Sequence, residues 1–214
     1  MAEKKELERR DFLCEVRAEQ TERGRVLTGR PIVYNSRTDL GLFDEIIESG
    51  ALDKADLTDV RFLVNHDLSK IPLARSRRNN GNSTMQLSLD AEGLAIRVDL
   101  DTENNADARA LYSAVERGDI TGMSFMFAVR AQEWENLDTD HPLRRITDIS
   151  TVVEVSAVTF PAYDAAGIYA RSEEALESAR AELESARQQR AESLDSDKAS
   201  LELAKAKYTF KSKF

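Results

Sequence analysis

Three residues have side chains capable of acid–base or nucleophilic chemistry and stand in informative patterns: His66, Ser124 and Glu154. His66 ends the run VRFLVNH, whose strand-like alternation places the imidazole on the same face as the apolar residues of the run. An imidazole at the rim of a core could act as a general base, although a packed, hydrogen-bonded histidine has the same pattern. The other histidine, His141, lies in the polar turn DTDHP, which is typical of a solvated loop.

Ser124 stands at the start of the alternating run GMSFMFAV, directly after a helix, a tight turn and Gly122. The bulky residues Met123, Phe125 and Phe127 fall on the opposite face, which leaves room around the hydroxyl, and a nucleophilic serine needs that access. A serine on the less buried face of a strand is also common. The run is not the G-x-S-x-G turn of the α/β-hydrolases, so that enzyme class loses support.

Glu154 lies within the run TVVEVSAVTF, which is mostly apolar on both faces and therefore predicts a central, buried strand. An ionised carboxylate in that position needs a partner that binds its charge. A histidine is one such partner, because orienting an imidazole is the role of the acid in a Ser-His-acid triad. An arginine at the end of a barrel is the alternative.

These runs belong to a series of short alternating or β-branched segments that predict a mainly β domain. The predicted strands are Phe12–Ala18, Val26–Tyr34, Val60–Asn65, Met85–Leu89, Leu94–Leu100, Ser124–Val129 and Thr151–Phe160. One helix is predicted at Asn105–Arg117, with Thr102 or Asn104 as its N-cap and Gly118 as its stop, and a shorter one near Ser49–Lys54. The pattern indicates an α+β fold, in which a closed or partly closed β-barrel is surrounded by a few helices.

The composition divides the chain into a charged arm at 1–10, a β-rich domain at 11–171 and a tail at 172–214. No Gly or Pro follows Gly167, and the tail consists mainly of strong helix formers. Its apolar residues follow a broken 3-4 spacing, which predicts a long, weakly amphipathic helix that pairs with a partner. A solvated and partly disordered tail is the alternative.

Charge and cysteine content exclude several classes of function. The net charge of −9 argues against nucleic acid as the main partner. No run approaches the roughly 18 apolar residues of a membrane span, and the first ten residues lack the apolar core of a secretory signal. We therefore expect an intracellular protein with no membrane association. The single cysteine, Cys14, cannot form an internal disulfide and is expected to be a small core residue, and neither a metal nor a cofactor is expected.

Taken in order along the chain, several motifs resemble the phage prohead maturation protease family (HK97-type prohead serine proteases), which is related to the herpesvirus assembly proteases. The motifs are GRPIVYNS from Gly29, FDEIIESGAL from Phe43, LVNHD from Leu63, GDITGMSFMF from Gly118 and VEVSAVTFPA from Val153. They span about residues 26–170, roughly two thirds of the chain. The ordered set carries the resemblance, since each motif alone is common.

The resemblance implies a serine endopeptidase on a β-barrel surrounded by helices. Carried over by position, His66 would be the general base, Ser124 the nucleophile and Glu154 the acid that orients His66. The herpesvirus relatives have a second histidine as third member, so His141 stays as the alternative to Glu154. Met126 stands where the family often has glycine, which would narrow the site or reduce activity.

The resemblance also implies a role in capsid maturation, inside the assembling prohead in the host cytoplasm. The substrates would be the scaffolding segment of the major capsid protein or a separate scaffold protein, together with the protease itself, and self-association is compatible with this setting. The tail would dock on scaffold or coat protein and be removed by self-cleavage. Three alternatives stay open: a catalytically weak capsid-assembly protein on the same fold, a small β-barrel binding module with a helical oligomerisation tail, and a metal-dependent hydrolase using Asp138, Asp140 and His141.

Overall fold

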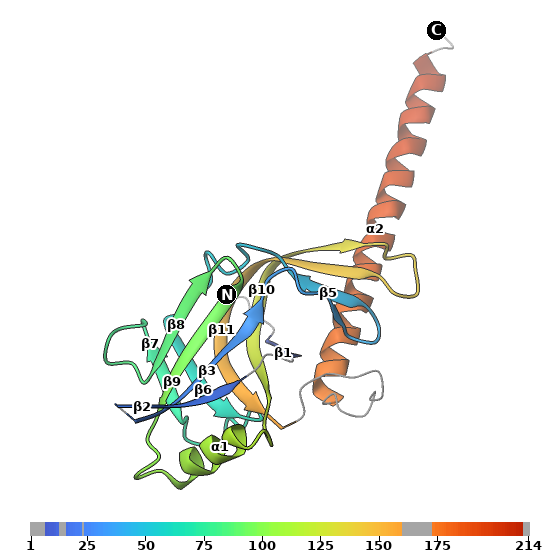
Figure 1. The fold of residues 1–214 in the computed structure, drawn as a ribbon. Coiled ribbons are helices and arrows are strands. Elements are labelled where there is room, and N and C mark those ends of the chain that lie inside the picture. The colour runs from blue at the N-terminus through green and yellow to red at the C-terminus, as the bar shows by residue number, and fades with distance from the viewer. Residues whose placement is uncertain (1–6, 13–15, 23, 160–172, 212–214) are drawn as a thin grey trace.

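The computed structural model describes residues 7–12, 16–22, 24–159 and 173–211, which form two β-sheets and two helices (Figure 1). The helices are α1 (Ala106–Glu116) and α2 (Glu173–Lys211). The strands are β1 (Glu8–Phe12), β2 (Arg17–Thr21), β3 (Gly24–Val33), β4 (Thr38–Asp39), β5 (Asp44–Ile47), β6 (Asp59–Val64), β7 (Ala74–Arg77), β8 (Met85–Asp90), β9 (Gly93–Leu100), β10 (Gly122–Glu135) and β11 (Leu143–Val158). The predicted mainly β fold with helices is confirmed. No helix in the described parts of the chain is long and apolar enough to span a membrane.

The larger sheet is built around the long antiparallel pair of β10 and β11. Its main order is β1-β10-β11-β5-β4, and β6 and β7 extend from another part of β11. Both β5 and β6 run parallel to β11, β5 along its first residues and β6 near its end. The smaller sheet has the antiparallel order β2-β3-β9-β8. Strand β11 therefore organises the larger sheet, because it pairs with three other strands.

The hydrophobic core lies between the two sheets. Ile32 and Val98 enter it from the smaller sheet, and Phe62 and Phe125 from the larger one. Helix α1 adds an apolar face that includes Leu111, and it lies across one end of the strands (Figure 1). The strand pairings among the described residues close neither sheet on itself. The predicted closed barrel is therefore not confirmed.

Helix α1 matches the predicted helix, but its N-cap differs from the expectation. The side chain of Asn105 accepts hydrogen bonds from the amides of Asp107 and Ala108, so Asn105 caps the helix rather than Thr102 or Asn104. An asparagine directly before the first helical residue reaches the free amides of the first turn, whereas a cap placed earlier in the chain cannot.

Two glycines in the left-handed region explain why α1 ends where predicted and why the short helix predicted near Ser49–Lys54 does not form. Gly118, with φ of +79°, follows α1 and ends it as predicted. Gly50, with φ of +83°, lies in the segment predicted as a short helix. Residues 49–54 instead form consecutive turns, in which the amide of Asp53 bonds to the carbonyl of Gly50. A left-handed residue interrupts the regular dihedral angles that a helix requires.

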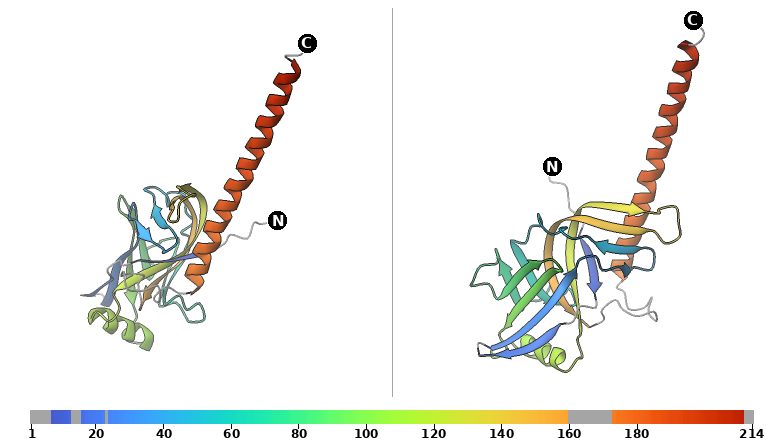
Figure 2. Two further views of the ribbon diagram at one scale, coloured as in Figure 1. Left: turned by 90° about the vertical axis from the view of Figure 1, so that its right-hand side faces the viewer. Right: turned by 45° about the horizontal axis from the view of Figure 1, so that its top comes forward.

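The tail forms the predicted long helix, and only its first part contacts the sheets (Figure 2). Leu183 is buried with Leu40 and Phe43 in a small apolar cluster, and Ala186 is also buried. Residues 187–205 are exposed, and the helix continues away from the strands (Figures 1 and 2). Leu194 and Leu201 are 50% and 55% exposed. The apolar side chains of Leu194 and Leu201 therefore face solvent.

The N-terminal part of the chain contributes a strand to the larger sheet. Strand β1 begins within the predicted charged arm at 1–10 and pairs with β10. Cys14 and the middle of the predicted strand Phe12–Ala18 lie outside the described residues, as does the predicted boundary at 171/172.

Candidate active site

The structure brings His66, Ser124 and Glu154 into one chain of contacts. Nε2 of His66 lies 2.5 Å from Oγ of Ser124, and Nδ1 of the same ring contacts Oε1 of Glu154. In this arrangement the carboxylate can hold the hydrogen on Nδ1, which leaves Nε2 free to accept the serine hydrogen. The three residues predicted for catalysis are thus in contact, over sequence separations of 58 and 88 residues.

The register of β10 and β11 places Ser124 and Glu154 on one face of the sheet. Ser124 lies opposite Ser156, and Met126 lies opposite Glu154. Because side chains alternate along a strand, Glu154 and Ser156 project to the same side as Ser124 and Met126. Ser124 and Glu154 are both 0% exposed, and Met126 is buried beside them. The methionine noted in the sequence therefore lies on the same face as the serine.

A tight turn, rather than the alternation of β6, aims the imidazole of His66. Strand β6 ends at Val64, and both Asn65 (φ +51°) and His66 (φ +58°) take the left-handed conformation. This conformation costs about 1–2 kcal/mol for a residue with a Cβ. The predicted position of His66 on the apolar face of the strand is therefore wrong, because the strand ends two residues earlier.

Hydrogen bonds to β11 and the residue after it hold this turn. The amide of His66 donates to Oγ of Ser156 at 3.1 Å. The side-chain amide of Asn65 donates to Oγ1 of Thr159 at 3.0 Å, and the amide of Thr159 donates back to Oδ1 of Asn65 at 2.9 Å. The turn therefore stays in its strained conformation because the neighbouring strand holds it on both sides.

Glu154 has hydrogen-bond partners for both carboxylate oxygens. Oε1 contacts Nδ1 of His66, and Oε2 accepts a hydrogen bond from Oγ of Ser156 at 2.6 Å. Of the two partners that the sequence allowed, the structure has the histidine. Ser156 was not singled out in the sequence, although it lies two residues after Glu154 on the same strand face and contacts both Glu154 and the backbone of His66. A polar residue at that spacing is the signal that could have identified it.

Strand β1 covers Ser124 from the remaining edge of β10. The two strands are antiparallel, and Asp11 lies opposite Ser124. Oγ of Ser124 donates a hydrogen bond to the backbone carbonyl of Arg10 at 2.9 Å. Sequence reasoning missed this contact, since the first ten residues predicted only a charged arm.

Four buried charged side chains connect β1 to β5 and β11. Nε of Arg10 donates to Oε1 of Glu45 at 2.6 Å, and Nη1 of Arg144 donates to Oε2 of Glu8 at 2.6 Å and to Oε2 of Glu45 at 2.8 Å. Burial alone would raise the pKa of Glu8, but the positive charges of Arg10 and Arg144 outweigh it and lower that pKa. We call Glu8, Arg10, Glu45 and Arg144 the buried charge group.

His141 lies in a different cluster of titratable side chains. Its Nε2 is 3.2 Å from Oδ1 of Asp44 and 3.7 Å from Oδ1 of Asp39. The predicted cluster of His141 with Asp138 and Asp140 is therefore wrong: among the described residues, the atoms that could ligate a metal and lie within 4.8 Å of one another belong to Asp39, Asp44 and His141.

Asp44 in this cluster is already paired with the positive side chain of Arg37. Nε of Arg37 donates to Oδ2 of Asp44 at 2.7 Å. Burial would raise the pKa of Asp44, but hydrogen bonds from Arg37 and His141 outweigh it and lower that pKa. The guanidinium opposes a metal ion at the same carboxylate, so the cluster is better described as an ion pair than as a metal site.

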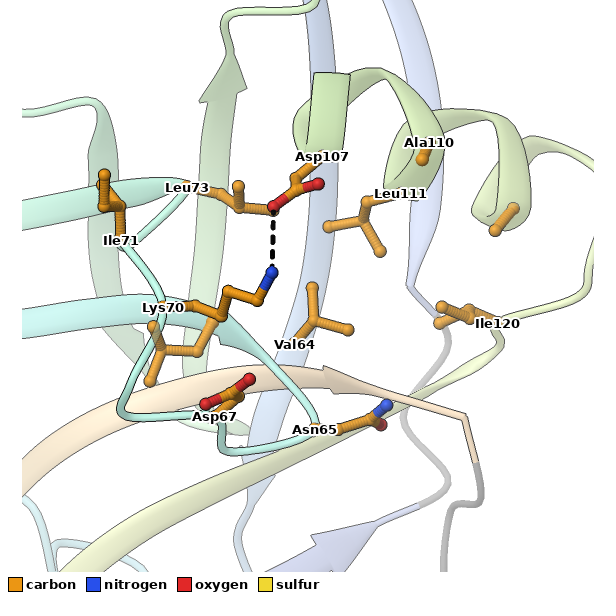
Figure 3. A pocket seen from close by; sticks show the side chains of 12 residues that line it. Val64, Asn65, Asp67, Lys70, Ile71, Leu73, Asp107, Ala110, Leu111 and Ile120 are labelled. Atoms are coloured by element: carbon orange, nitrogen blue, oxygen red, sulfur yellow. Dashed lines mark ion pairs between the residues drawn. The ribbon is translucent and has the colours of Figure 1, made fainter. Parts of the chain in front are cut away.

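A cavity of about 410 Å³ lies beside the His66 turn, between that turn and α1 (Figure 3). Apolar side chains, among them Val64, Leu73 and Leu111, line it, and an ion pair between Lys70 and Asp107 at 3.9 Å crosses it. Its lining does not include Ser124, His66 or Glu154. The cavity therefore adjoins the candidate site without opening onto the serine.

Comparisons with known proteins agree with these observations. Residues 13–180 match the family model described as "Caudovirus prohead serine protease". The chain is 28% identical over 159 residues to the prohead protease of Enterobacteria phage HK97, across 72% of this chain and 64% of that relative. The chain thus spans about 64% of the length of the curated relative that it matches.

The solved structure of the bacteriophage T4 capsid assembly protease, gp21, is also similar. Its TM-score is 0.44 at 10% identity, over 73% of this chain and 98% of that one. The match to the family model covers most of the chain and includes all three residues of the contact chain described above. This protein belongs to the caudovirus prohead serine protease family.

Proposed function

We propose that the protein is a serine endopeptidase of capsid maturation in which Ser124 is the nucleophile, His66 the general base and Glu154 the acid that orients His66. The observation that supports this most directly is the unbroken line of contacts from Glu154 through both nitrogens of His66 to Oγ of Ser124. These atoms belong to three segments far apart in the sequence. Their convergence has the geometry that nucleophilic catalysis by serine requires.

In the proposed reaction, neutral His66 takes the hydrogen of Ser124 while Oγ attacks the carbonyl carbon of a peptide bond. Glu154 holds the Nδ1 hydrogen and stabilises the imidazolium that forms. The imidazolium then protonates the leaving amine, and water hydrolyses the acyl-enzyme with the same histidine as base. A histidine base predicts a rate that rises with pH through a pKa of about 6–7. A rate that is flat between about pH 5 and 8 would contradict it.

The proposed substrates are the scaffolding segment of the major capsid protein or a separate scaffold protein, together with the protease itself, inside the assembling prohead in the host cytoplasm. Membership in the prohead protease family supports this setting. The acidic net charge of −9 is compatible with it, because an acidic protein or its fragments would not bind the DNA that enters later.

One observation favours the alternative of a catalytically weak capsid-assembly protein. Ser124 is 0% exposed, with Met126 on its own face and the carbonyl of Arg10 on its hydroxyl. A substrate peptide cannot reach the serine while the backbone of Arg10 occupies this position. The chain must therefore either open at the site or act without cleavage.

Intact mass spectrometry separates the two functions. The chain is expressed alone and with its capsid or scaffold partner, as wild type, Ser124→Ala and Ser76→Ala. Ser76 is the matched control, because it is also 0% exposed and its hydroxyl has no hydrogen-bond partner among the described residues. We expect discrete shortening of the chain or partner in wild type and Ser76→Ala, and none in Ser124→Ala. Full-length masses in all three samples would favour the assembly protein.

We further propose that α2 docks the enzyme on scaffold or coat protein and is later removed by self-cleavage. Its exposed part, residues 187–205, supports this, because an exposed helix with Leu194 and Leu201 on its surface can pair with another helix. A chain ending at Arg190 keeps the buried contacts of Leu183 and loses the exposed part. Its incorporation into proheads should fall well below that of the full chain, and equal incorporation would refute the docking role.

A further inference from the structure

Strand β1 occupies the edge of the strand that carries Ser124. Its five residues pair with β10 alone, while the other edge of β10 pairs with β11. An extended peptide that bound beside Ser124 by adding to β10 would have to take the position of β1. Strand addition of this kind is a common mode of peptide recognition, because backbone hydrogen bonds hold the peptide whatever its sequence.

The backbone of β1 contacts the hydroxyl of Ser124 directly. The carbonyl oxygen of Arg10 is 2.9 Å from Oγ of Ser124, and Nε2 of His66 is 2.5 Å from the same Oγ. A hydroxyl has one hydrogen, so the carbonyl of Arg10 competes with His66 for the hydrogen that a general base must take. While β1 is bound, it covers Ser124, and the serine hydroxyl is hydrogen-bonded to the Arg10 carbonyl.

The side chain of Arg10 lies in a site that suits a basic residue. It is 3% exposed, and its guanidinium binds both carboxylate oxygens of Glu45, at 2.6 and 2.9 Å. Paired bonds of this kind are the strongest that a carboxylate forms with arginine. Glu45 belongs to β5 and stays in place when β1 leaves, whereas Glu8, which also binds Arg10, belongs to β1 itself.

The charges show that β1 can leave without stranding a buried ion. Strand β1 brings one carboxylate and one guanidinium to the buried charge group, from Glu8 and Arg10. After its departure Glu45 and Arg144 still pair, at 2.8 Å. A strand that supplied an unbalanced charge would leave an uncompensated ion in the interior, which is strongly unfavourable. A peptide that replaces β1 keeps the balance best if it also carries an acidic residue two positions before a basic one.

We propose that β1 fills the substrate-binding edge of the protease, and that the substrate is an extended peptide segment of the pattern acidic-x-basic, cleaved after the basic residue. The inference rests on the proposed function. Oγ of Ser124 would bond to the carbonyl carbon of the basic residue, and its hydrogen would pass through His66 to the departing amide nitrogen. Water then releases the new carboxyl terminus and restores the serine.

The test uses the full chain as wild type, Arg10→Gln and Arg97→Gln, with a synthetic peptide of residues 6–13 (ELERRDFL) as substrate. Arg10→Gln leaves Glu8 and Glu45 with the single guanidinium of Arg144, so β1 should detach. Arg97 is the matched control, because it lies on β9 of the smaller sheet, its side chain is 40% exposed, and it pairs only near the surface with Asp99 at 3.2 Å. Mass spectrometry reads both the rate and the bond cut.

We expect Arg10→Gln to cut the peptide after its Arg10 about tenfold faster than wild type or more, because the open form becomes the main population. Arg97→Gln should cut at the wild-type rate. A peptide with Gln in place of Arg10 should be cut about tenfold more slowly by every chain, and a peptide with Gln in place of Arg9 should be cut normally.

Equal rates for all chains, with no preference for the basic residue, would overturn the inference and leave the proposed function standing. Absence of any cleavage, of peptides and of capsid or scaffold partner alike, would overturn both. If Arg10→Gln shows no cooperative thermal unfolding and is therefore not folded, the test rests on the wild-type chain alone. In that case, wild type must prefer the peptide that keeps Arg10 to the peptide with Gln in its place, and equal cutting of the two refutes the proposed pattern.

Discussion

Arg144→Met is the substitution for which we expect the largest loss of stability. The side chain is 0% exposed, and Nη1 donates to Glu8 and Glu45 at 2.6 and 2.8 Å, while Nε donates to Gln132 at 2.6 Å. Methionine fills a similar length without charge, so two buried carboxylates are left with the guanidinium of Arg10. Removing one member of such a buried ion group costs about 3–5 kcal/mol.

Detachment of β1 cannot relieve this cost. It removes Glu8 and Arg10 together and leaves Glu45 with neither guanidinium. The loss in Arg144→Met therefore persists however β1 responds. Arg10→Gln differs, because detachment of β1 leaves Glu45 paired with Arg144 at 2.8 Å. We therefore expect Arg10→Gln to be the milder of the two substitutions.

Thermal unfolding followed by circular dichroism measures the difference. In a domain of this size 1 kcal/mol shifts the midpoint by about 2–4 °C, so Arg144→Met should lower it by about 6–20 °C. Arg145→Met is the matched control. Arg145 is the next residue of β11, its side chain is 31% exposed, and it pairs with Glu135 and Glu48 near the surface. Its replacement should lower the midpoint far less, because water already screens such pairs.

A rescue variant tests the reason for the loss rather than its size alone. Arg144→Met with Glu45→Met removes one charge of each sign, so Glu8 and Arg10 remain as a balanced pair. The double variant should recover most of the lost midpoint, since an apolar pair often replaces a buried ion pair at little cost. Equal shifts for Arg144→Met and Arg145→Met, or a double variant less stable than Arg144→Met alone, would refute the charge-balance argument.

Three further predictions follow from the site and the tail. Glu154→Gln should lower kcat on the capsid or scaffold partner by about 10²–10⁴ while the chain stays folded, because the amide cannot stabilise the imidazolium; an unchanged rate contradicts the role of Glu154. Burial alone would raise the pKa of Glu8, but the two buried guanidinium groups lower it. Its contribution to stability is therefore complete above the unfolded pKa of about 4.3 and is lost as the pH falls through the lower folded pKa, so in urea unfolding Glu8→Gln should flatten the acid side of the stability curve. Leu183→Ser should lower the thermal midpoint, whereas Leu194→Ser, at a side chain that is 50% exposed, should not, and equal effects would contradict the described docking of α2.

Much of the fold follows from local sequence patterns. The alternating runs around Val60, Ser124 and Glu154 predict strands that the structure contains, because alternation of apolar and polar residues is a property of a single strand. Helix α1 and its stop at Gly118 are also predicted, because helix-forming residues and a glycine at the helix end are likewise local features of the sequence. How the sheets meet is not a local property, and the predicted closure of a barrel depended on it.

The residues missed by sequence reasoning are those whose partners are distant in the chain. Glu8 and Arg10 stand among charged neighbours and predict a solvated arm, yet Glu8 binds Arg144 across 136 residues and Arg10 binds Glu45 across 35. A charged residue reveals its burial only through its partner. Without the pairing of β1 with β10, no feature of the first ten residues distinguishes these two from exposed charges.

The geometry at His66 depends on two registers that meet on β11. The antiparallel pairing with β10 sets Ser124 opposite Ser156, and the parallel pairing with β6 brings the turn after Val64 beside the same serine. A shift of either strand by one residue would turn its side chains to the other face. Ser156 lies where both pairings meet, since it donates to Glu154 and accepts from the amide of His66. The strained turn at His66 is therefore maintained by the same strand that positions the acid and the nucleophile, which explains why a site assembled from distant segments can be held within hydrogen-bond distances.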